Sequence, residues 1–188
     1  MNRPYGHGVR IVGGTLGGRR LEMLGAGANS IRATSDRARE AVFNMLVSLQ
    51  PMDGITVLDL FAGTGALGME ALSRGAVHAT FVDSDPTACR MVTTNLKTLD
   101  ISERATVVRS DVLTFLSGQP GPAGLAFADP PYRFDSWRDL VDAVKADVLV
   151  CESDREIEPG IHAEWQTHRV RRYGTPVITI LNRRIADG

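Results

Sequence analysis

Four acidic residues lie at or just after the ends of four apolar segments, and together they could bind a ligand that carries positive charge and hydroxyl groups. They are Asp59, Asp83, Asp111 and Asp129. The apolar segments are typical of strands, and helical patterns separate them. In such a sheet, ligands bind where the carboxyl ends of the strands meet. The spacing therefore predicts one site that gathers these acids.

A glycine-rich segment, LFAGTGALG, follows Asp59 and opens a predicted helix. Its glycines, Gly63, Gly65 and Gly68, let the backbone pass close under a ligand and present N–H groups at the start of the helix. Nicotinamide and flavin enzymes share this spacing, so the glycines alone do not identify a cofactor. A dinucleotide, however, would bring its pyrophosphate against the Asp59 carboxylate. S-adenosylmethionine carries an ammonium and a sulfonium instead, and the sequence favours it.

Two of the other acids have positions that suit the nucleoside part of a cofactor. Asp83, at the end of the second predicted strand, could accept hydrogen bonds from two ribose hydroxyls, which fits a dinucleotide equally well. Asp111 could accept from the amino group of an adenine. Small-molecule and nucleic-acid methyltransferases both use this arrangement, so the residues indicate the cofactor more firmly than the substrate.

The segment FADPPY, residues 127–132, supplies groups that could hold a substrate. Prolines lack the N–H that a strand needs, so the strand must end at Asp129. The Asp129 carboxylate and the Pro130 carbonyl could accept both hydrogens of an exocyclic amine and turn its delocalised lone pair toward the methyl group. Tyr132 would stack on the base, and the prolines would keep the acceptors rigid. A plain strand stop is the alternative, and it explains neither the acid nor the ring.

The elements around these residues predict a mostly parallel sheet with helices on both faces, closed by an antiparallel hairpin. Strands are expected at 55–61, 79–83, 105–109, 125–129 and 147–152, with the hairpin at 168–173 and 175–181. Helices are expected from Thr34 or Ser35 to Leu49, over 65–75, from Asp85 to about Leu99, and near 112–117 and 136–146. A glycine-rich β-hairpin is expected at 9–24.

Composition limits the class of protein. At 188 residues, 43% of them hydrophobic, the chain can form one well-cored domain with an appendage. It shows neither a signal-peptide pattern nor an apolar run near the ~20 residues that a membrane span needs. Cys89 and Cys151 lack metal-like spacing and the four histidines are scattered, so we expect no metal and a reducing cytoplasm.

Positive charge gathers toward the two ends of the sequence. Residues 1–40 hold seven arginines and three acids, and residues 167–184 hold five arginines and no acid. The part between them, 41–166, has nine basic and eighteen acidic residues. Because the guanidinium group fits phosphate bidentately, and no lysine is among the twelve, the two ends are predicted to contact a polyanion. Ordinary solvated charge is the alternative for either cluster alone.

Several motifs resemble those of the RsmD-type 16S ribosomal RNA guanine-N2 methyltransferases. They are RIVGG, RATSDRAREAVFNML, LDLFAGTGALGMEALSRGA, FVD, NL and DPPY. The resemblance runs from about Arg10 to the final strands, and the first two motifs are the most specific. Two residues depart from the usual pattern, since Ala33 replaces a proline and Asp83 replaces a glutamate.

This resemblance implies a Rossmann-like class I S-adenosylmethionine-dependent methyltransferase fold, with a mostly parallel seven-stranded sheet and a small N-terminal β-hairpin extension. Residues 1–30 would form an arm that engages RNA, and residues 31–188 would form the methyltransferase domain. The substrate would be the N2 of a guanine in 16S rRNA, guanine 966, within the assembled or assembling 30S subunit. The protein would act as a monomer in the cytoplasm.

The resemblance also assigns roles to individual residues. The cofactor would be surrounded by Asp59, Phe61, Gly63, Gly65, Asp83, Ser84, Asp111 and Val112. The target base would be held by Asp129, Pro130 and Tyr132. Phosphate contacts would come from Arg10, Arg19, Arg20, Arg32 and Arg37. The helix start at 35–37 would lie near the cofactor or the RNA, although a simple helix cap explains Asp36 equally well.

Other functions use related motifs. An adenine-N6 methyltransferase acting on DNA or RNA could have the same segment, although 188 residues leave little room for a DNA-reading domain. A glutamine methyltransferase is disfavoured because an aspartate, not an asparagine, stands at 129. A non-catalytic module that only binds S-adenosylmethionine would not need the DPPY residues.

Overall fold

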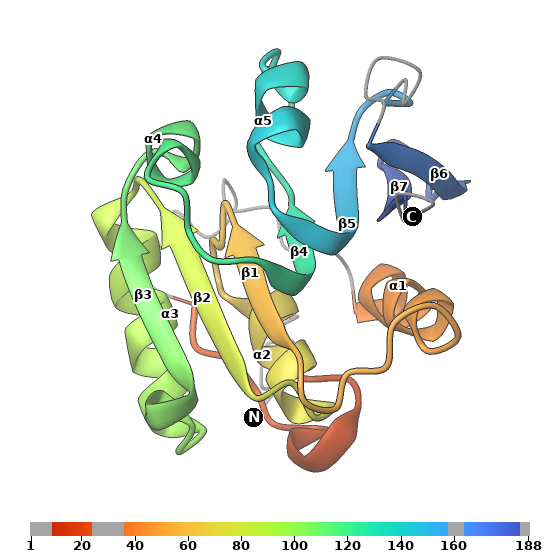
Figure 1. Cartoon of the computed structure of the whole chain (residues 1–188). Helices are drawn as coiled ribbons and strands as arrows, with labels where there is room; N and C mark the ends of the chain where they lie inside the picture. The colour runs from red at the N-terminus through yellow and green to blue at the C-terminus, as the bar shows by residue number, and fades with distance from the viewer. Residues whose placement is uncertain (1–8, 24–35, 158–163, 185–188) are drawn as a thin grey trace.

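The computed structural model describes residues 9–23, 36–157 and 164–184. They form one seven-stranded sheet in the order β3-β2-β1-β4-β5-β7-β6 (Figure 1). Strands β1 to β5 are parallel to one another, whereas β7 is antiparallel to both β5 and β6. The order changes direction between β1 and β4, and this is the point at which open α/β sheets bind ligands. The predicted Rossmann-like fold is confirmed.

The strands follow the apolar segments of the sequence. They are β1 (Thr56–Leu60), β2 (His78–Asp83), β3 (Ala105–Arg109), β4 (Ala123–Ala128), β5 (Ala146–Ser153), β6 (Trp165–Arg172) and β7 (Val177–Arg183). The helices are α1 (Asp36–Leu46), α2 (Ala66–Ser73), α3 (Pro86–Thr98), α4 (Val112–Ser117) and α5 (Trp137–Ala143), with short 3-10 turns η1 (Gly14–Leu16) and η2 (Ser102–Arg104). Apart from the N-terminal hairpin, each predicted strand and helix is present, and the bounds differ by a few residues. The expected caps Thr34 and Ser35 lie outside the described residues.

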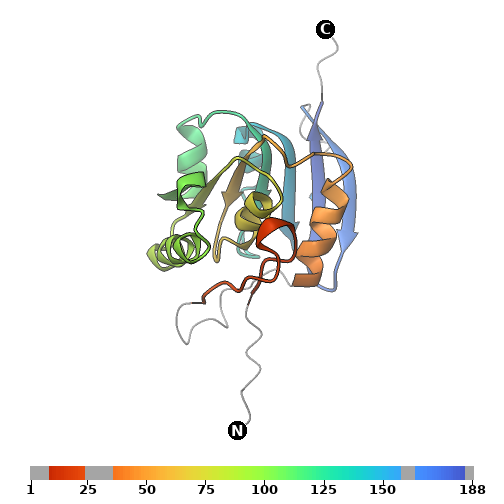
Figure 2. The ribbon, with the colours of Figure 1, turned by 90° about the horizontal axis from the view of Figure 1, so that it is seen from below.

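The helices cover both faces of the sheet, as Figure 2 shows from below. One face carries α1, α2 and α3, and its core includes Phe43, Met69 and Phe127. The other face carries α4 and α5 over a second core, in which Trp165 is 1% exposed and donates its indole N–H to the Val141 carbonyl. In the described part of the chain, no helix is long and apolar enough to cross a membrane.

The segment 9–23 doubles back as predicted, but it forms a single antiparallel bridge between Arg10 and Arg20 rather than two strands. Backbone hydrogen bonds join its two arms, with the Ile11 N–H donating to the Arg19 carbonyl at 2.9 Å and the Leu21 N–H to the Val9 carbonyl at 2.8 Å. Side chains of α2 bind further backbone N–H groups near the turn. The buried Glu70 carboxylate accepts the N–H groups of Val12 and Gly13, at 2.6 and 2.8 Å. Ser73 Oγ accepts from the Leu16 N–H at 2.9 Å. The turn of this hairpin is therefore fixed to the far end of α2, and Val9, Ile11 and Leu21 join the main core.

Candidate active site at the carboxyl edge of the sheet

The two strands that bear the glycine loop and the DPPY segment lie next to each other. Strand β1 pairs with β2 on one side and with β4 on the other, and Leu60 is in register with both Val82 and Ala128. The residues that follow these strands therefore leave the sheet at the same edge. This pairing brings Asp59, Asp83 and Asp129 to neighbouring strand ends, as the sequence predicted.

The glycine loop is closed by an acid of the neighbouring strand. Asp83 Oδ2 accepts the Gly63 N–H at 2.9 Å, and Asp83 Oδ1 accepts the Asp85 N–H at 2.9 Å. Gly65 caps α2 with φ of 77°, a left-handed conformation that glycine adopts without strain. Phe61 also has a positive φ, 63°, which is uncommon for an aromatic residue and typical of functional sites. The loop thus has a fixed backbone conformation.

Asp59 lies beneath the start of α2. It is 2% exposed, and its Oδ2 accepts the Gly68 N–H at 2.8 Å. A side chain at Gly68 would meet the Phe81 ring at 2.4 Å, so only glycine lets the helix approach this closely. Burial raises the pKa of Asp59 to about 7, the Gly68 hydrogen bond lowers it in part, and the nearby Asp83 carboxylate raises it further. The site therefore contains a carboxyl group that titrates near neutral pH.

These hydrogen bonds distinguish between the two cofactor classes. A pyrophosphate would need the N–H groups of the glycine loop and of the first turn of α2. Gly63 and Gly68 already donate theirs to the carboxylates of Asp83 and Asp59. A cationic ligand has no need of these donors and would relieve the desolvation of Asp59. The groups present fit the ammonium, sulfonium and ribose of S-adenosylmethionine better than a dinucleotide.

The DPPY segment is supported by a ring that the sequence analysis did not identify. Phe134 lies two residues beyond Tyr132, and its ring contacts Phe61 at a centroid distance of 5.3 Å and Trp137 at 5.3 Å. Its N–H donates to the Pro131 carbonyl at 2.8 Å, which closes a turn. Asp129 is half-buried, Pro130 is buried and Tyr132 is half-buried rather than exposed. The segment is thus held by packing as well as by its prolines.

Three other residues are predicted to surround the cofactor, and they differ in burial and in contacts. They are Ser84, Asp111 and Val112. Ser110 donates its N–H to the Asp83 carbonyl at 3.0 Å, which brings the end of β3 to the same edge. Asp111 caps α4 by accepting the Thr114 N–H at 2.9 Å. Val112 is 2% exposed and belongs to the second core, whereas Ser84 is exposed. The structure thus gives Asp111 and Val112 packing and capping contacts beside the site.

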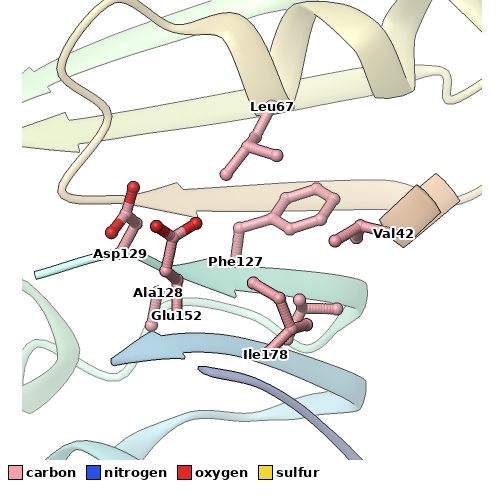
Figure 3. Close-up of a pocket in the computed structure, with 8 residues that line it drawn as sticks. Val42, Leu67, Phe127, Ala128, Asp129, Glu152 and Ile178 are labelled. Atoms are coloured by element: carbon pink, nitrogen blue, oxygen red, sulfur yellow. The ribbon is translucent and has the colours of Figure 1, made fainter. Parts of the chain in front are cut away.

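A small pocket opens between the sheet and the two helices α1 and α2. Its lining includes Asp129 together with Glu152, which is the next-to-last residue of β5. Figure 3 shows the two carboxylates close together, both on the side of the sheet that carries Leu67. Glu152 ends the strand predicted at 147–152, but it was not among the four acids predicted to form the site. The shared position of an acid at a strand end was the signal that could have found it.

The arginines predicted to contact phosphate do not all have free side chains. Arg10, Arg20 and Arg37 are exposed. Arg10 forms the isolated backbone bridge with Arg20, and its side chain forms a 2.9 Å ion pair with Asp36. Arg19 donates to the Thr98 carbonyl at the end of α3, at 2.9 Å. Arg32 lies outside the described residues.

The second cluster of arginines, in residues 167–184, also contains both exposed side chains and one that hydrogen-bonds within the protein. Arg169, Arg171 and Arg172 are exposed on β6, which is the edge strand of the sheet. Arg183 instead donates to the carbonyls of Val144 and Ala146, at 2.8 and 3.0 Å. The exposed charges on β6 also discourage edge-to-edge pairing with another chain.

Comparison with known proteins gives one consistent result. Residues 9–182 match the family described as "Conserved hypothetical protein 95". The chain is 34% identical to the ribosomal RNA small subunit methyltransferase D of Escherichia coli, over 93% of this chain and 91% of that protein. It is 36% identical to the Bacillus subtilis protein YlbH, over 94% of this chain and all of the relative. The solved structure of the Escherichia coli protein yhhF has 34% identity and a TM-score of 0.82, and the match covers 93% of this chain and 97% of that one. The chain therefore belongs to this family, that of the ribosomal RNA small subunit methyltransferase D (RsmD) proteins.

Proposed function

We propose that this protein transfers a methyl group from S-adenosylmethionine to the N2 of a guanine in the 16S rRNA of the small ribosomal subunit. The observation that carries the proposal is the adjacency of β1 and β4, which puts the Asp129–Pro130 acceptors beside the acids of the glycine loop. The family supports the reaction class, because its Escherichia coli member is named as a small-subunit rRNA methyltransferase.

The chain's residues would act on the nucleophile. The exocyclic amine of guanine is a weak nucleophile because its lone pair is delocalised into the ring. Asp129 and the Pro130 carbonyl accept its two hydrogens and hold the lone pair toward the methyl carbon, and Tyr132 stacks on the base. When bound, S-adenosylmethionine would supply an electrophilic methyl group and keep the electrons of its C–S bond. The guanine N2 that receives the methyl group would lose one proton to solvent.

The cofactor assignment makes a direct prediction about thermal stability. S-adenosylmethionine or S-adenosylhomocysteine at a hundred times its Kd should stabilise the protein by about 2.7 kcal/mol and raise its Tm. NAD should leave the Tm unchanged, because Asp59 and Asp83 occupy the N–H groups that its pyrophosphate would need. Asp83→Ala should weaken the response to S-adenosylhomocysteine by removing the ribose acceptor. Differential scanning fluorimetry checks this, and stabilisation by NAD alone would contradict the assignment.

The RNA-binding surface would include the arm, which ends at residue 30, and the first residues of the methyltransferase domain, which spans 31–188. The combined change Arg20→Ala and Arg37→Ala should weaken binding to the small subunit and leave cofactor binding intact. The slope of log affinity against log salt should fall by roughly 0.7 to 0.9 for each phosphate that the variant no longer neutralises. Arg138→Ala is the matched control, because Arg138 is also exposed but lies on α5, on the opposite face of the sheet. An unchanged salt slope in the double variant would mean that these arginines are only solvated surface charge.

The substrate itself is tested by the transfer of labelled methyl groups. We expect incorporation into the 16S rRNA of small subunits that lack the modification, by a monomeric enzyme of the cytoplasm, and none into duplex DNA. Naked 16S rRNA in a parallel reaction shows whether the assembled or assembling subunit is required. Incorporation into DNA alone would favour the adenine-N6 alternative, and cofactor binding without transfer to any of the three would favour a non-catalytic module.

A further inference from the structure

The pocket beside Asp129 contains a second carboxylate to which the proposed reaction assigns no role. Glu152 is 6% exposed, and the pocket between it and Asp129 is otherwise lined by apolar residues. Burying a charged group away from water is costly, so a glutamate at such a position calls for a specific function. A carboxylate has about four acceptor positions, so it can hold a base donor as well as a partner within the protein.

Strand register explains why Glu152 and Asp129 face the same space. Strands β4 and β5 are parallel, and Phe127 pairs with Val150 and Ala128 with Cys151. Extending the register by one residue sets Asp129 beside Glu152, and residues in register on neighbouring strands point to the same face. Figure 3 shows this arrangement, with both carboxylates beyond the Phe127 ring and toward α2. Neighbouring strands lie about 4.8 Å apart, so the two groups can reach adjacent atoms of one base edge.

We infer that Glu152 determines base specificity by accepting the N1–H of the target guanine while Asp129 holds its N2 amine. This inference rests on the proposed function. Guanine presents N1–H and N2–H as neighbouring donors on its Watson–Crick edge, which is the edge that base-flipping enzymes read. Adenine presents an acceptor at N1, and a carboxylate facing it would leave two acceptors opposed. Glu152 thus attracts guanine and also rejects adenine, the base of the alternative reaction.

The inference is tested by changing the enzyme and the base together. Once the methylated guanine is mapped, small subunits are reconstituted with either guanine or 2-aminopurine at that position. 2-Aminopurine keeps the N2 amine but has an acceptor at N1, and it also lacks O6. Glu152→Gln can accept from the N1–H of guanine or donate to the N1 of 2-aminopurine. We expect wild type to prefer guanine in kcat/KM, and Glu152→Gln to reduce this preference by roughly 10- to 100-fold, the range for a hydrogen bond to a charged group. The missing O6 affects both enzymes, so it cancels from the comparison.

Asp147→Asn is the control, because it removes an exposed carboxylate from the same strand outside the pocket. It should keep the wild-type preference. If Glu152→Gln transfers too slowly to measure, the same ratio is taken from equilibrium binding of the two subunits, with S-adenosylhomocysteine binding as the check on folding. An unchanged ratio in Glu152→Gln, with or without a lower Tm, would overturn the inference and leave Glu152 as a structural residue. Failure of wild type to methylate any guanine would instead overturn the proposed function.

Discussion

Replacing Asp129 with alanine is expected to abolish methyl transfer while the protein stays folded and still binds its cofactor. Asp129 follows β4 directly, so its carboxylate lies at the strand end and beside the pocket. The segment that carries it is fixed by the buried Pro130 and by the ring contact between Phe134 and Phe61. Losing one preorganised polar partner in such a site typically costs ~10²–10³ in rate, and losing a charged acceptor costs more.

Asp129→Asn separates orientation from charge. The amide oxygen can still accept one hydrogen bond from the guanine amine, but the negative charge is gone. We therefore expect the order Asp, Asn, Ala in single-turnover rates at saturating cofactor. Asp135→Ala is the control, because Asp135 is exposed in the same loop and pairs only with Arg155 among the ion pairs of the described residues. An alanine variant at position 129 with a near wild-type rate would show that the prolines and the acid only end a strand.

Cofactor affinity is expected to depend on pH through Asp59. Its pKa of about 7 is set mainly by burial, and only the ionised form can pair with the cofactor's ammonium group. Below pH 7 the affinity for S-adenosylhomocysteine should fall by about tenfold per pH unit, reaching roughly 100-fold at pH 5. Above about pH 8 it should fall again, because α-amino groups lose their proton near 7.7 to 8.0. Titration calorimetry from pH 5 to 9 measures this profile.

The same group makes a prediction about stability, and its sign follows from the direction of the shift. A pKa raised from 3.8 in the unfolded chain to about 7 in the folded protein means that the unfolded state gives up its proton first. Stability is then lost as the pH rises from about 4 to 7, by an amount on the order of 4 kcal/mol. Asp59→Asn keeps an acceptor for the Gly68 N–H and cannot ionise. It should raise the Tm at pH 8 but not at pH 4, and remove the acid-side loss of cofactor affinity. A wild-type affinity that is constant between pH 5 and 7 would contradict the pairing.

The sequence predicted the sheet and the carboxyl edge well because both follow from local patterns. Apolar runs with flanking glycines and prolines mark strands, and the acids at their ends were visible directly. Asp85 capping α3, with Pro86 at its first position, is a signal contained within a few residues, and the structure has it, with the Thr87 N–H donating to Asp85 at 2.7 Å.

What the sequence did not reveal depends on contacts between distant residues. Glu70 lies within the helix predicted over 65–75, where no local pattern marks it, yet it is fully buried, pairs with Arg74 at 2.8 Å and fixes the backbone of Val12 and Gly13. The bond to Val12 spans 58 residues of sequence and fixes the hairpin to α2, which no local pattern predicts. Arg39 is among the arginines of residues 1–40 that the sequence predicts to contact a polyanion, but it is 0% exposed and pairs with Asp36. The positions of Phe134 and Glu152 in the site follow from the order of β1, β4 and β5, which local sequence patterns do not predict.

Methylation of a guanine N2 in small-subunit rRNA leaves a specific product, and the identity of the modified nucleoside shows whether this protein makes it. Small subunits lacking the modification are incubated with the protein and S-adenosylmethionine carrying a labelled methyl group. Their 16S rRNA is then digested to nucleosides and analysed by mass spectrometry, with the Asp129→Ala variant in parallel. We expect the label in N2-methylguanosine, at one position, with the wild type only. Label in N6-methyladenosine, or no labelled nucleoside from a protein that binds the cofactor, would contradict guanine-N2 methylation by this protein.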